Sequence, residues 1–123
     1  MPRECKRRMG SKGVWGQIYV LQNSQDPTDN NYYVGGTTEK CLRQRMKRHR
    51  YECTHPNRHH YSYKVYEHIR STGGMEKWEI VQLEAGVFAN KQELREREQM
   101  WIDQLRPTLN TMEAVRPAKR IIL

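Results

Sequence analysis

Apolar positions in this chain fall into short segments of two kinds, which differ in period. Residues 14–21 and 31–34 are rich in β-branched and aromatic residues and predict two β-strands. The polar stretch 22–30 between them predicts a long loop, so the two strands form a hairpin. Residues 77–83 alternate between apolar and polar positions and predict a third strand.

Helical signals occupy the segments between and after these strands. Thr38 is a favourable N-cap and predicts a helix from there to about Tyr51. Residues 61–70 carry apolar side chains at helical spacing and predict a second helix, which two glycines terminate. Asn90 followed by Glu93 predicts a capping box for a third helix that runs to about residue 105.

These segments follow one another in the order β-β-α-α-β-α. The order predicts an α/β (α+β) domain, in which helices flank a small three-stranded antiparallel sheet. At 123 residues the chain has room for one such domain, which we place at residues 14–112. The remaining ends, 1–13 and 113–123, are basic and predict an N-terminal arm and a C-terminal tail.

The charge balance indicates what kind of partner the protein binds. Lysine and arginine number 22 against 14 acidic residues, a net charge of +8, which suits nucleic acid or an acidic membrane surface. The sequence contains no apolar run of the roughly 18 residues that a membrane span needs, and no signal peptide. Three scattered cysteines favour a reducing compartment. We therefore expect a soluble intracellular protein, in the cytoplasm or nucleoid, without a membrane partner.

Much of the positive charge is concentrated in the first predicted helix. Residues 40–50 include six basic side chains and no acidic one, which predicts a positive ridge suited to a phosphate backbone. A solvated helix face is the plainer interpretation of the same cluster. The residues that we expect to contact DNA are Lys40, Arg43, Lys47, Arg48 and Arg50.

Arg45 and His49 lie one helical turn apart within this ridge. At about 100° of rotation per residue, both fall at the edge of the apolar stripe defined by Leu42 and Met46, so we expect them to face a cleft. The alternative is a pair of exposed basic residues.

Glu98 is the exceptional position of the last predicted helix. It lies four residues after Leu94, inside the apolar stripe that continues through Trp101 and Leu105. A carboxylate at such a position is costly unless something compensates it. Metal coordination would do so, as would a buried ion pair with Arg45. A third interpretation is a shifted helix phase that leaves Glu98 at the rim.

Taken together and in order, these residues resemble the GIY-YIG nuclease superfamily. The resemblance covers about residues 14–110, and its five motifs are Gly16-Gln17-Ile18-Tyr19, Tyr33-Val34-Gly35, the helix segment 42–49, the segment 98–102 and Pro107-Thr108-Leu109-Asn110. In the first motif Gln17 is inserted, and in the second Val34 replaces isoleucine.

The resemblance implies a DNA endonuclease that hydrolyses phosphodiester bonds with one divalent cation, Mg²⁺ or Mn²⁺, per active site. Glu98 would be the metal ligand, and Arg45 would stabilise the transition state at the scissile phosphate. Tyr19 is the candidate for activating the attacking water.

The same resemblance assigns supporting roles to five further residues. Tyr33 and His49 would orient the water and relay its proton, for which His49 is suited by a near-neutral pKa. Asn110 would shape the pocket by bonding to the backbone or to a tyrosine. Gly35 and Gly36 would let the backbone turn tightly and approach DNA.

Two other functions fit parts of the sequence. A non-catalytic module that binds nucleic acid would explain the charge equally well, with the tyrosines serving only as packing. The cysteines and histidines between residues 41 and 60 could also hold zinc, although only Cys53 and His55 approach the usual ligand spacing. A compact nuclease would suit a phage, virus or mobile element, and cutting both strands would require a homodimer or sequential action.

Overall fold

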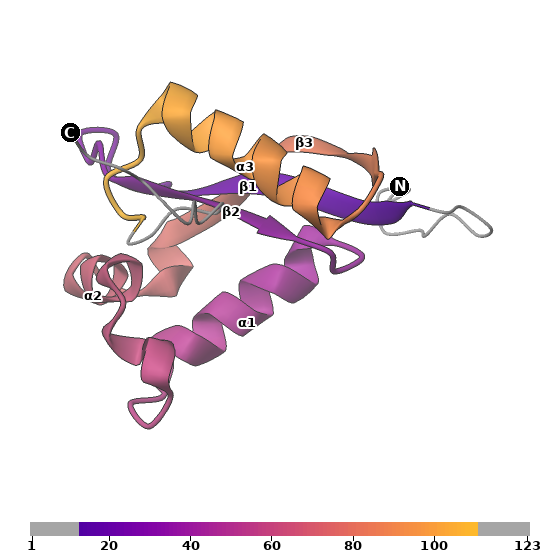
Figure 1. Cartoon of the computed structure of the whole chain (residues 1–123). Coiled ribbons are helices and arrows are strands. Elements are labelled where there is room, and N and C mark those ends of the chain that lie inside the picture. Colours follow the sequence, from indigo (N-terminus) through magenta and orange to yellow (C-terminus); the bar gives the residue numbers. More distant parts are fainter. Residues whose placement is uncertain (1–12, 111–123) are drawn as a thin grey trace, which may run out of the picture.

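The computed structural model describes residues 13–110, and the predicted basic tail and all but the last residue of the predicted arm lie outside them. The elements are β1 (Val14–Asn23), β2 (Tyr32–Thr37), α1 (Leu42–Thr54), α2 (Lys64–Ser71), β3 (Trp78–Phe88) and α3 (Lys91–Leu105), with short 3-10 turns at His59–Ser62 and Met75–Lys77. The strands form a three-stranded antiparallel sheet, as predicted, in which β1 lies between β2 and β3. Figure 1 shows the sheet between α3 on one face and α1 with α2 on the other.

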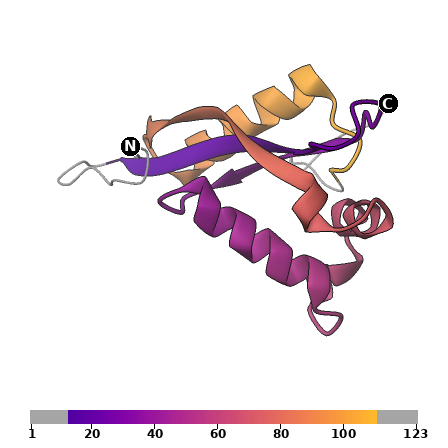
Figure 2. The same ribbon diagram turned by 180° about the vertical axis from the view of Figure 1, so that it is seen from behind.

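The central strand β1 divides the core in two. Ile18 and Val20 face α3 and pack in a cluster with Leu94, whereas Tyr19 and Leu21 face α1 and α2 in a second cluster. This alternation follows from the two-residue period of a strand. The view from behind shows the same layers (Figure 2). Both faces of the sheet are therefore buried where β1 crosses it.

Two boundaries of α1 differ from the prediction. The helix begins at Leu42 with Cys41 as its N-cap, three residues later than the predicted N-cap Thr38, and it ends at Thr54. β2 remains paired with β1 up to Thr37, so the following residues are needed to carry the chain from the sheet to the helix layer. The Thr37 hydroxyl accepts a hydrogen bond from the backbone N–H of Glu39 (3.0 Å), which stabilises this turn instead of a helix.

The predicted capping box of α3 is confirmed. The Asn90 side chain accepts a hydrogen bond from the N–H of Glu93 (2.8 Å), and the Glu93 carboxylate accepts one from Ala89. The helix ends at Leu105, and its C-cap Arg106 adopts the left-handed conformation with φ of 50° just before Pro107.

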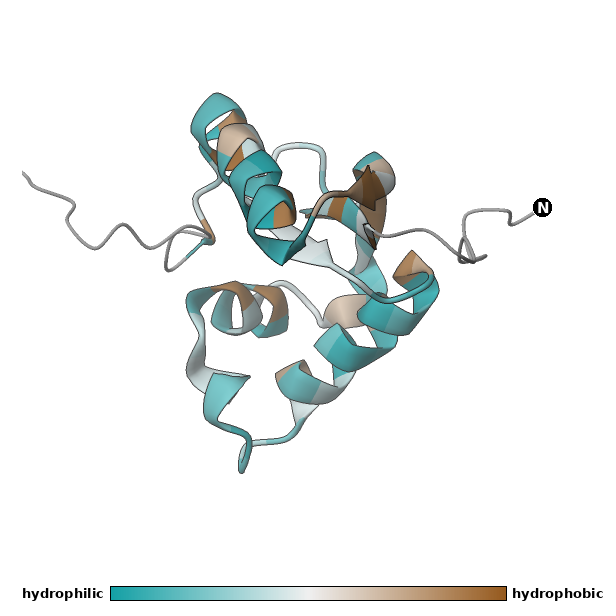
Figure 3. Ribbon diagram, turned by 45° about the vertical axis from the view of Figure 1, so that its right-hand side comes forward, coloured by the Kyte–Doolittle hydropathy of each residue, from teal (hydrophilic) through white to brown (hydrophobic). Residues whose placement is uncertain are grey.

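Along its length α1 is mainly hydrophilic, as Figure 3 shows by residue hydropathy. Its few buried side chains include His49, Glu52 and Cys53 near its C-terminal half. None of the helices described between residues 13 and 110 is long and apolar enough to cross a membrane.

Candidate active site

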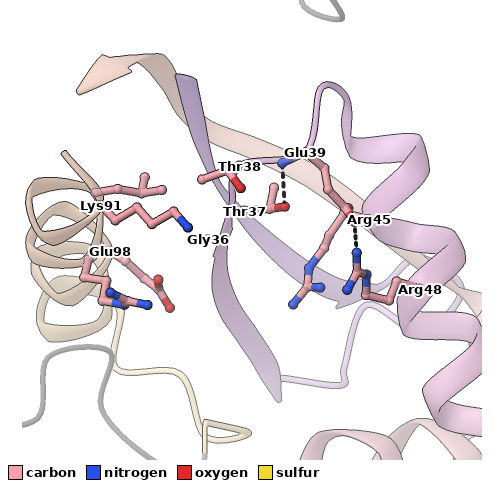
Figure 4. Close-up of a pocket in the computed structure, with 10 residues that line it drawn as sticks. Gly36, Thr37, Thr38, Glu39, Arg45, Arg48, Lys91 and Glu98 are labelled. Atoms are coloured by element: carbon pink, nitrogen blue, oxygen red, sulfur yellow. Dashed lines mark hydrogen bonds and ion pairs between the residues drawn. The ribbon is translucent and has the colours of Figure 1, made fainter. Parts of the chain in front are cut away.

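A cleft of about 270 Å³ lies at the outer edge of the sheet, where β2 passes between α1 and α3. Figure 4 shows Arg45 and Arg48 on one side of β2, and Glu98 and Lys91 on the other. The cleft therefore takes its side chains from both layers of helices. Its lining residues are Gly36, Thr37, Thr38, Glu39, Arg45, Arg48, Lys91, Leu94, Arg95 and Glu98.

Two consecutive glycines in β2 allow the two layers to approach each other. A Cβ atom on Gly36 would lie 2.6 Å from Oε1 of Glu98, and one on Gly35 would lie 2.5 Å from the Tyr19 hydroxyl. Successive residues of a strand face opposite sides, so each glycine makes room on one face of the sheet. The expectation of a tight turn at these two glycines is wrong, because both lie within β2 and neither has a positive φ.

A chain of hydrogen bonds joins four side chains on the α1 side of the sheet. Arg45 Nε donates to the Tyr19 hydroxyl (3.0 Å), and that hydroxyl lies 2.7 Å from His49 Nε2. His49 Nδ1 lies 2.7 Å from the hydroxyl of Tyr66, a buried residue of α2. The structure thus brings Arg45, His49 and Tyr19 together, as the motifs predicted, and adds Tyr66 to them.

Burial controls the protonation of these hydrogen-bonded side chains. It raises the pKa of Tyr19 above its ordinary value, and the opposing effect of Arg45 is smaller. It also lowers the pKa of His49 to about 3, with Arg45 and Arg48 acting in the same direction. The expectation of a near-neutral His49 is therefore wrong: at pH 7 its imidazole is neutral, with one nitrogen donating and the other accepting.

Counting hydrogens shows that one hydroxyl of the chain has no acceptor within it. Tyr19, His49 and Tyr66 contribute three hydrogens to only two contacts. If Tyr66 donates to Nδ1, then Nε2 donates to Tyr19, and the Tyr19 hydrogen is available to another acceptor. Helical spacing had identified Tyr66 only as an apolar position, because a contact between α1 and α2 leaves no local signal in the sequence.

Tyr33 contributes its ring rather than its hydroxyl. The ring centroid lies 6.4 Å from that of Tyr19 and 5.9 Å from that of His49. Within residues 13–110 the Tyr33 hydroxyl makes no hydrogen bond, and burial raises its pKa above the ordinary value. A direct proton relay between Tyr33 and His49 therefore lacks the contact that it needs.

Glu98 lies on the α3 wall with its carboxylate against Gly36. It is half-buried, and within the described residues no hydrogen bond or ion pair engages it, so the predicted alternative of an ion pair with Arg45 is not formed. Burial raises the pKa of Glu98 to about 7, and the charges of Arg45 and Arg95 oppose this rise. The carboxylate is thus a half-buried charge without a bonded partner among the described residues, and a cation in the cleft would compensate it.

The donor set around Glu98 restricts the kind of metal that fits. A carboxylate oxygen is a hard ligand suited to Mg²⁺ or Mn²⁺. Among residues 13–110, no group of three or more His, Cys, Asp or Glu side chains is placed to hold a metal together. A cation at Glu98 would therefore have at most two such side-chain ligands among these residues and would keep most of its water or bind substrate oxygens.

Asn110 acts on the backbone of β2. Its side-chain oxygen accepts from the N–H of Val34 (3.0 Å), and its amide nitrogen donates to the carbonyl of Val34 (2.8 Å). The N–H of Leu109 bonds to the carbonyl of Tyr32 (3.1 Å), so residues 109 and 110 run along the outer edge of β2. Asn110 thus shapes the site through the backbone, which was one of the two expected modes.

The predicted basic ridge is exposed but does not form a single surface. At about 100° per residue, Arg43, Lys47 and Arg50 share one flank of α1, and Arg45 faces away from them. Arg48 lines the cleft and pairs with Glu39. Lys40 precedes the helix and is exposed.

Lys91 and Arg95 line the opposite wall of the cleft and were not among the predicted site residues. In the sequence Glu98 alone indicated a site on α3, because a carboxylate in an apolar stripe is unusual and an exposed cation is not. Residues 91, 95 and 98 recur at the spacing of one helix face, which is the signal that could have identified both cations.

Comparison with known proteins identifies a family for most of the chain. The model of the GIY-YIG catalytic domain matches residues 15–112. Searches of curated proteins and of solved structures gave no match.

Proposed function

Because the chain belongs to the GIY-YIG nuclease family, we propose that it is a divalent-metal-dependent DNA endonuclease. The observation that carries this proposal is the unpaired Glu98 carboxylate, which faces Arg45 in one cleft. A protein that only bound nucleic acid would gain from the absence of this negative charge. The cleft instead combines a metal ligand with a phosphate ligand.

Glu98 is the residue that would hold Mg²⁺ or Mn²⁺, one ion per site. When bound, the ion withdraws charge from the scissile phosphate and from the departing 3′ oxygen. Gly36 keeps the space beside the carboxylate open, since any larger residue would collide with Oε1.

Arg45 binds the scissile phosphate in this proposal. Its Nε donates to Tyr19, which fixes the plane of the guanidinium and leaves both terminal nitrogens for phosphate oxygens. Charge that develops on the phosphate is then stabilised by a group that is already oriented.

Tyr19 and His49 orient the attacking water and the phosphate in this proposal. Neither residue accepts the proton that the water loses. A proton that left water through Tyr19 would reach His49 Nε2, which lies 2.7 Å away. The low pKa of His49 opposes that transfer, and the raised pKa of Tyr19 keeps the phenol protonated. Both residues therefore act as neutral hydrogen-bonding groups, and the ring of Tyr33 packs against them.

DNA is the proposed partner, held mainly by the charge of α1. Arg48 would contact the strand that enters the cleft. The exposed side chains of Lys40, Arg43, Lys47 and Arg50 would neutralise phosphates outside it. A helix with basic side chains on both flanks can contact two phosphate backbones at once.

Incubation of supercoiled plasmid with Mg²⁺ or Mn²⁺, and with chelator, tests this function. We expect metal-dependent nicking, with open circles appearing before linear DNA if each site cuts one strand. Glu98→Gln should abolish cleavage and preserve or improve DNA binding, because it removes the metal ligand and one negative charge.

Glu96→Gln is the matched control, since Glu96 is exposed on the same helix and does not line the cleft. It should cut like the wild type. Cleavage by Glu98→Gln at the wild-type rate would remove Glu98 from the reaction. Retained DNA binding without any metal-dependent cutting would favour the binding module.

A further inference from the structure

The cleft carries more positive charge than the scissile phosphate can neutralise. Four cations and two carboxylates line it, so its side chains have a net charge of about +2 at neutral pH when Glu98 is ionised. A divalent cation at Glu98 would raise this charge to about +4, whereas one phosphodiester carries a single negative charge. The excess lies on the α3 wall, because Arg48 is already paired with Glu39.

Lys91 and Arg95 account for this excess. They lie one helical turn apart on α3, and Glu98 lies one turn further along the same face. In Figure 4 the amino group of Lys91 points from α3 toward β2, across the same opening as the Glu98 carboxylate. Arg95 lines the same cleft as Glu98.

Neither cation has a structural partner in the described part of the chain. No hydrogen bond or ion pair between residues 13 and 110 engages Lys91 or Arg95, whereas Arg97 on the same helix is held by Glu84. Lys91 is moreover the first residue of α3, where a cation is unfavourable beside the positive end of the helix dipole. Both side chains are therefore available to an anionic ligand.

We propose that Lys91 and Arg95 form a second phosphate subsite, which binds a phosphate adjacent to the scissile one on the same DNA strand. The inference rests on the proposed nuclease function, because that function supplies the strand. Arg45 and the Glu98 carboxylate define the scissile position from opposite walls of the cleft. The two α3 cations lie beyond Glu98 on its own wall, where the neighbouring phosphodiester of a strand in the cleft would lie.

The subsite makes the enzyme selective for a polynucleotide. A ligand that fills it must carry at least two consecutive phosphodiesters, so a small phosphodiester with a single phosphate should be a poor substrate. Binding at the subsite also holds the strand in register with Arg45, which lowers KM more than it raises kcat.

Neutral phosphate analogues test the proposal directly. A DNA duplex with a mapped cleavage site is prepared with a single methylphosphonate at each position around the site in turn. Kinetics are then measured for the wild type, for Lys91→Ala and for Arg95→Ala. Lys64→Ala is the control, because it removes one exposed charge from α2 and does not line the cleft.

We expect each of the two subsite variants to raise KM roughly tenfold with kcat nearly unchanged, and to reduce the salt dependence of binding by about one phosphate contact. In the wild type, methylphosphonate at one position flanking the scissile phosphate should weaken binding by a similar factor. The same substitution should have a smaller effect in Arg95→Ala than in the wild type, because the phosphate there has already lost one of its two cationic partners and retains only Lys91.

Two results would overturn the subsite. One is that both variants behave like Lys64→Ala on every substrate, and the other is that the methylphosphonate effects are the same in Arg95→Ala as in the wild type. If no cleavage occurs with either metal, the same comparison is made by equilibrium binding in chelator. If the methylphosphonate and Arg95→Ala are coupled in binding but no cleavage occurs, the subsite is supported and the proposed nuclease function is refuted. Absence of DNA binding would refute both.

Discussion

Without metal, acidification from pH 7.5 to pH 5 should change the stability of the wild-type protein little, because His49 and Glu98 respond in opposite directions. Both side chains belong to the site, and both have a pKa far from the ordinary value. Proton binding that differs between folded and unfolded chains changes the free energy of unfolding by about 1.4 kcal/mol per proton and pH unit.

His49 destabilises the folded protein in acid. Its pKa is lowered from 6.5 to about 3, so below pH 6.5 the unfolded chain takes up a proton that the folded chain does not. The stability that the buried neutral imidazole contributes is present above pH 6.5 and is lost as the pH falls toward 3. Between pH 7.5 and pH 5 this loss amounts to about 2 kcal/mol.

Glu98 has the opposite effect in the same range. Its pKa is raised from 4.5 to about 7, so the folded chain takes up its proton first as the pH falls. Protonation relieves the penalty of the buried charge and stabilises the folded protein by about 2 kcal/mol between pH 7.5 and pH 5. The two contributions nearly cancel in the wild type.

Single variants should separate the two contributions in urea unfolding experiments with chelator present. In Glu98→Gln only the response of His49 to pH remains, so the free energy of unfolding of this variant should fall by about 2 kcal/mol on acidification from pH 7.5 to pH 5. His49→Gln should gain about 2 kcal/mol over the same range. Glu96→Gln should follow the wild type. If the two variants respond to pH with the same sign, the assigned burial of these groups is wrong.

Three further predictions concern the geometry of the site. Arg45→Lys keeps the charge but loses the bond to Tyr19 and the planar fork, so plasmid cleavage should fall by about 100-fold with DNA binding retained, whereas Arg97→Lys, outside the cleft, should cut normally. Gly36→Ala forces a methyl group against Glu98 and should raise the metal concentration needed for cleavage, while Gly86→Ala, which meets no atom within 4 Å, should leave that requirement unchanged; equal requirements would refute the close contact. Asn110→Ala leaves both backbone groups of Val34 unpaired and should lower the free energy of unfolding by about 1–3 kcal/mol in urea, with faster hydrogen exchange at the Val34 amide.

Local patterns predicted most of the fold because they reflect local physics. The strands of the hairpin, the capping box at Asn90 and the order of elements follow from side-chain period and hydrogen-bonding residues within a few positions of one another. The start of α1 was missed for the same reason. Thr38 has the chemistry of an N-cap, but the pairing of Thr37 with Gln17 on β1 holds the chain in the sheet, and that pairing is not a local property.

The sequence predicted which residues form the site more successfully than it predicted their pKa values and their surroundings. Helical phase placed Arg45 at a cleft and Glu98 on the inward face of its helix, and both line the cleft. His49 was expected at the cleft as well, but it is buried in the core. The pKa of His49 could not be obtained in this way, because it depends on burial by Tyr19 and Tyr66 from two other elements. The cations at Lys91 and Arg95 were hidden among many exposed cations, and only the cleft distinguishes them.

The contacts of Asn110 with Val34 have a consequence for the order in which the sheet is completed during synthesis. β2 is the outer strand of the sheet, and its exposed edge would otherwise be a template for pairing with other chains. Residues 109 and 110 occupy that edge beside the two glycines of the cleft. A nascent chain that has not yet emerged from the ribosome as far as Asn110 lacks this clamp, so the outer edge of β2 stays open until residues 109 and 110 have been synthesised.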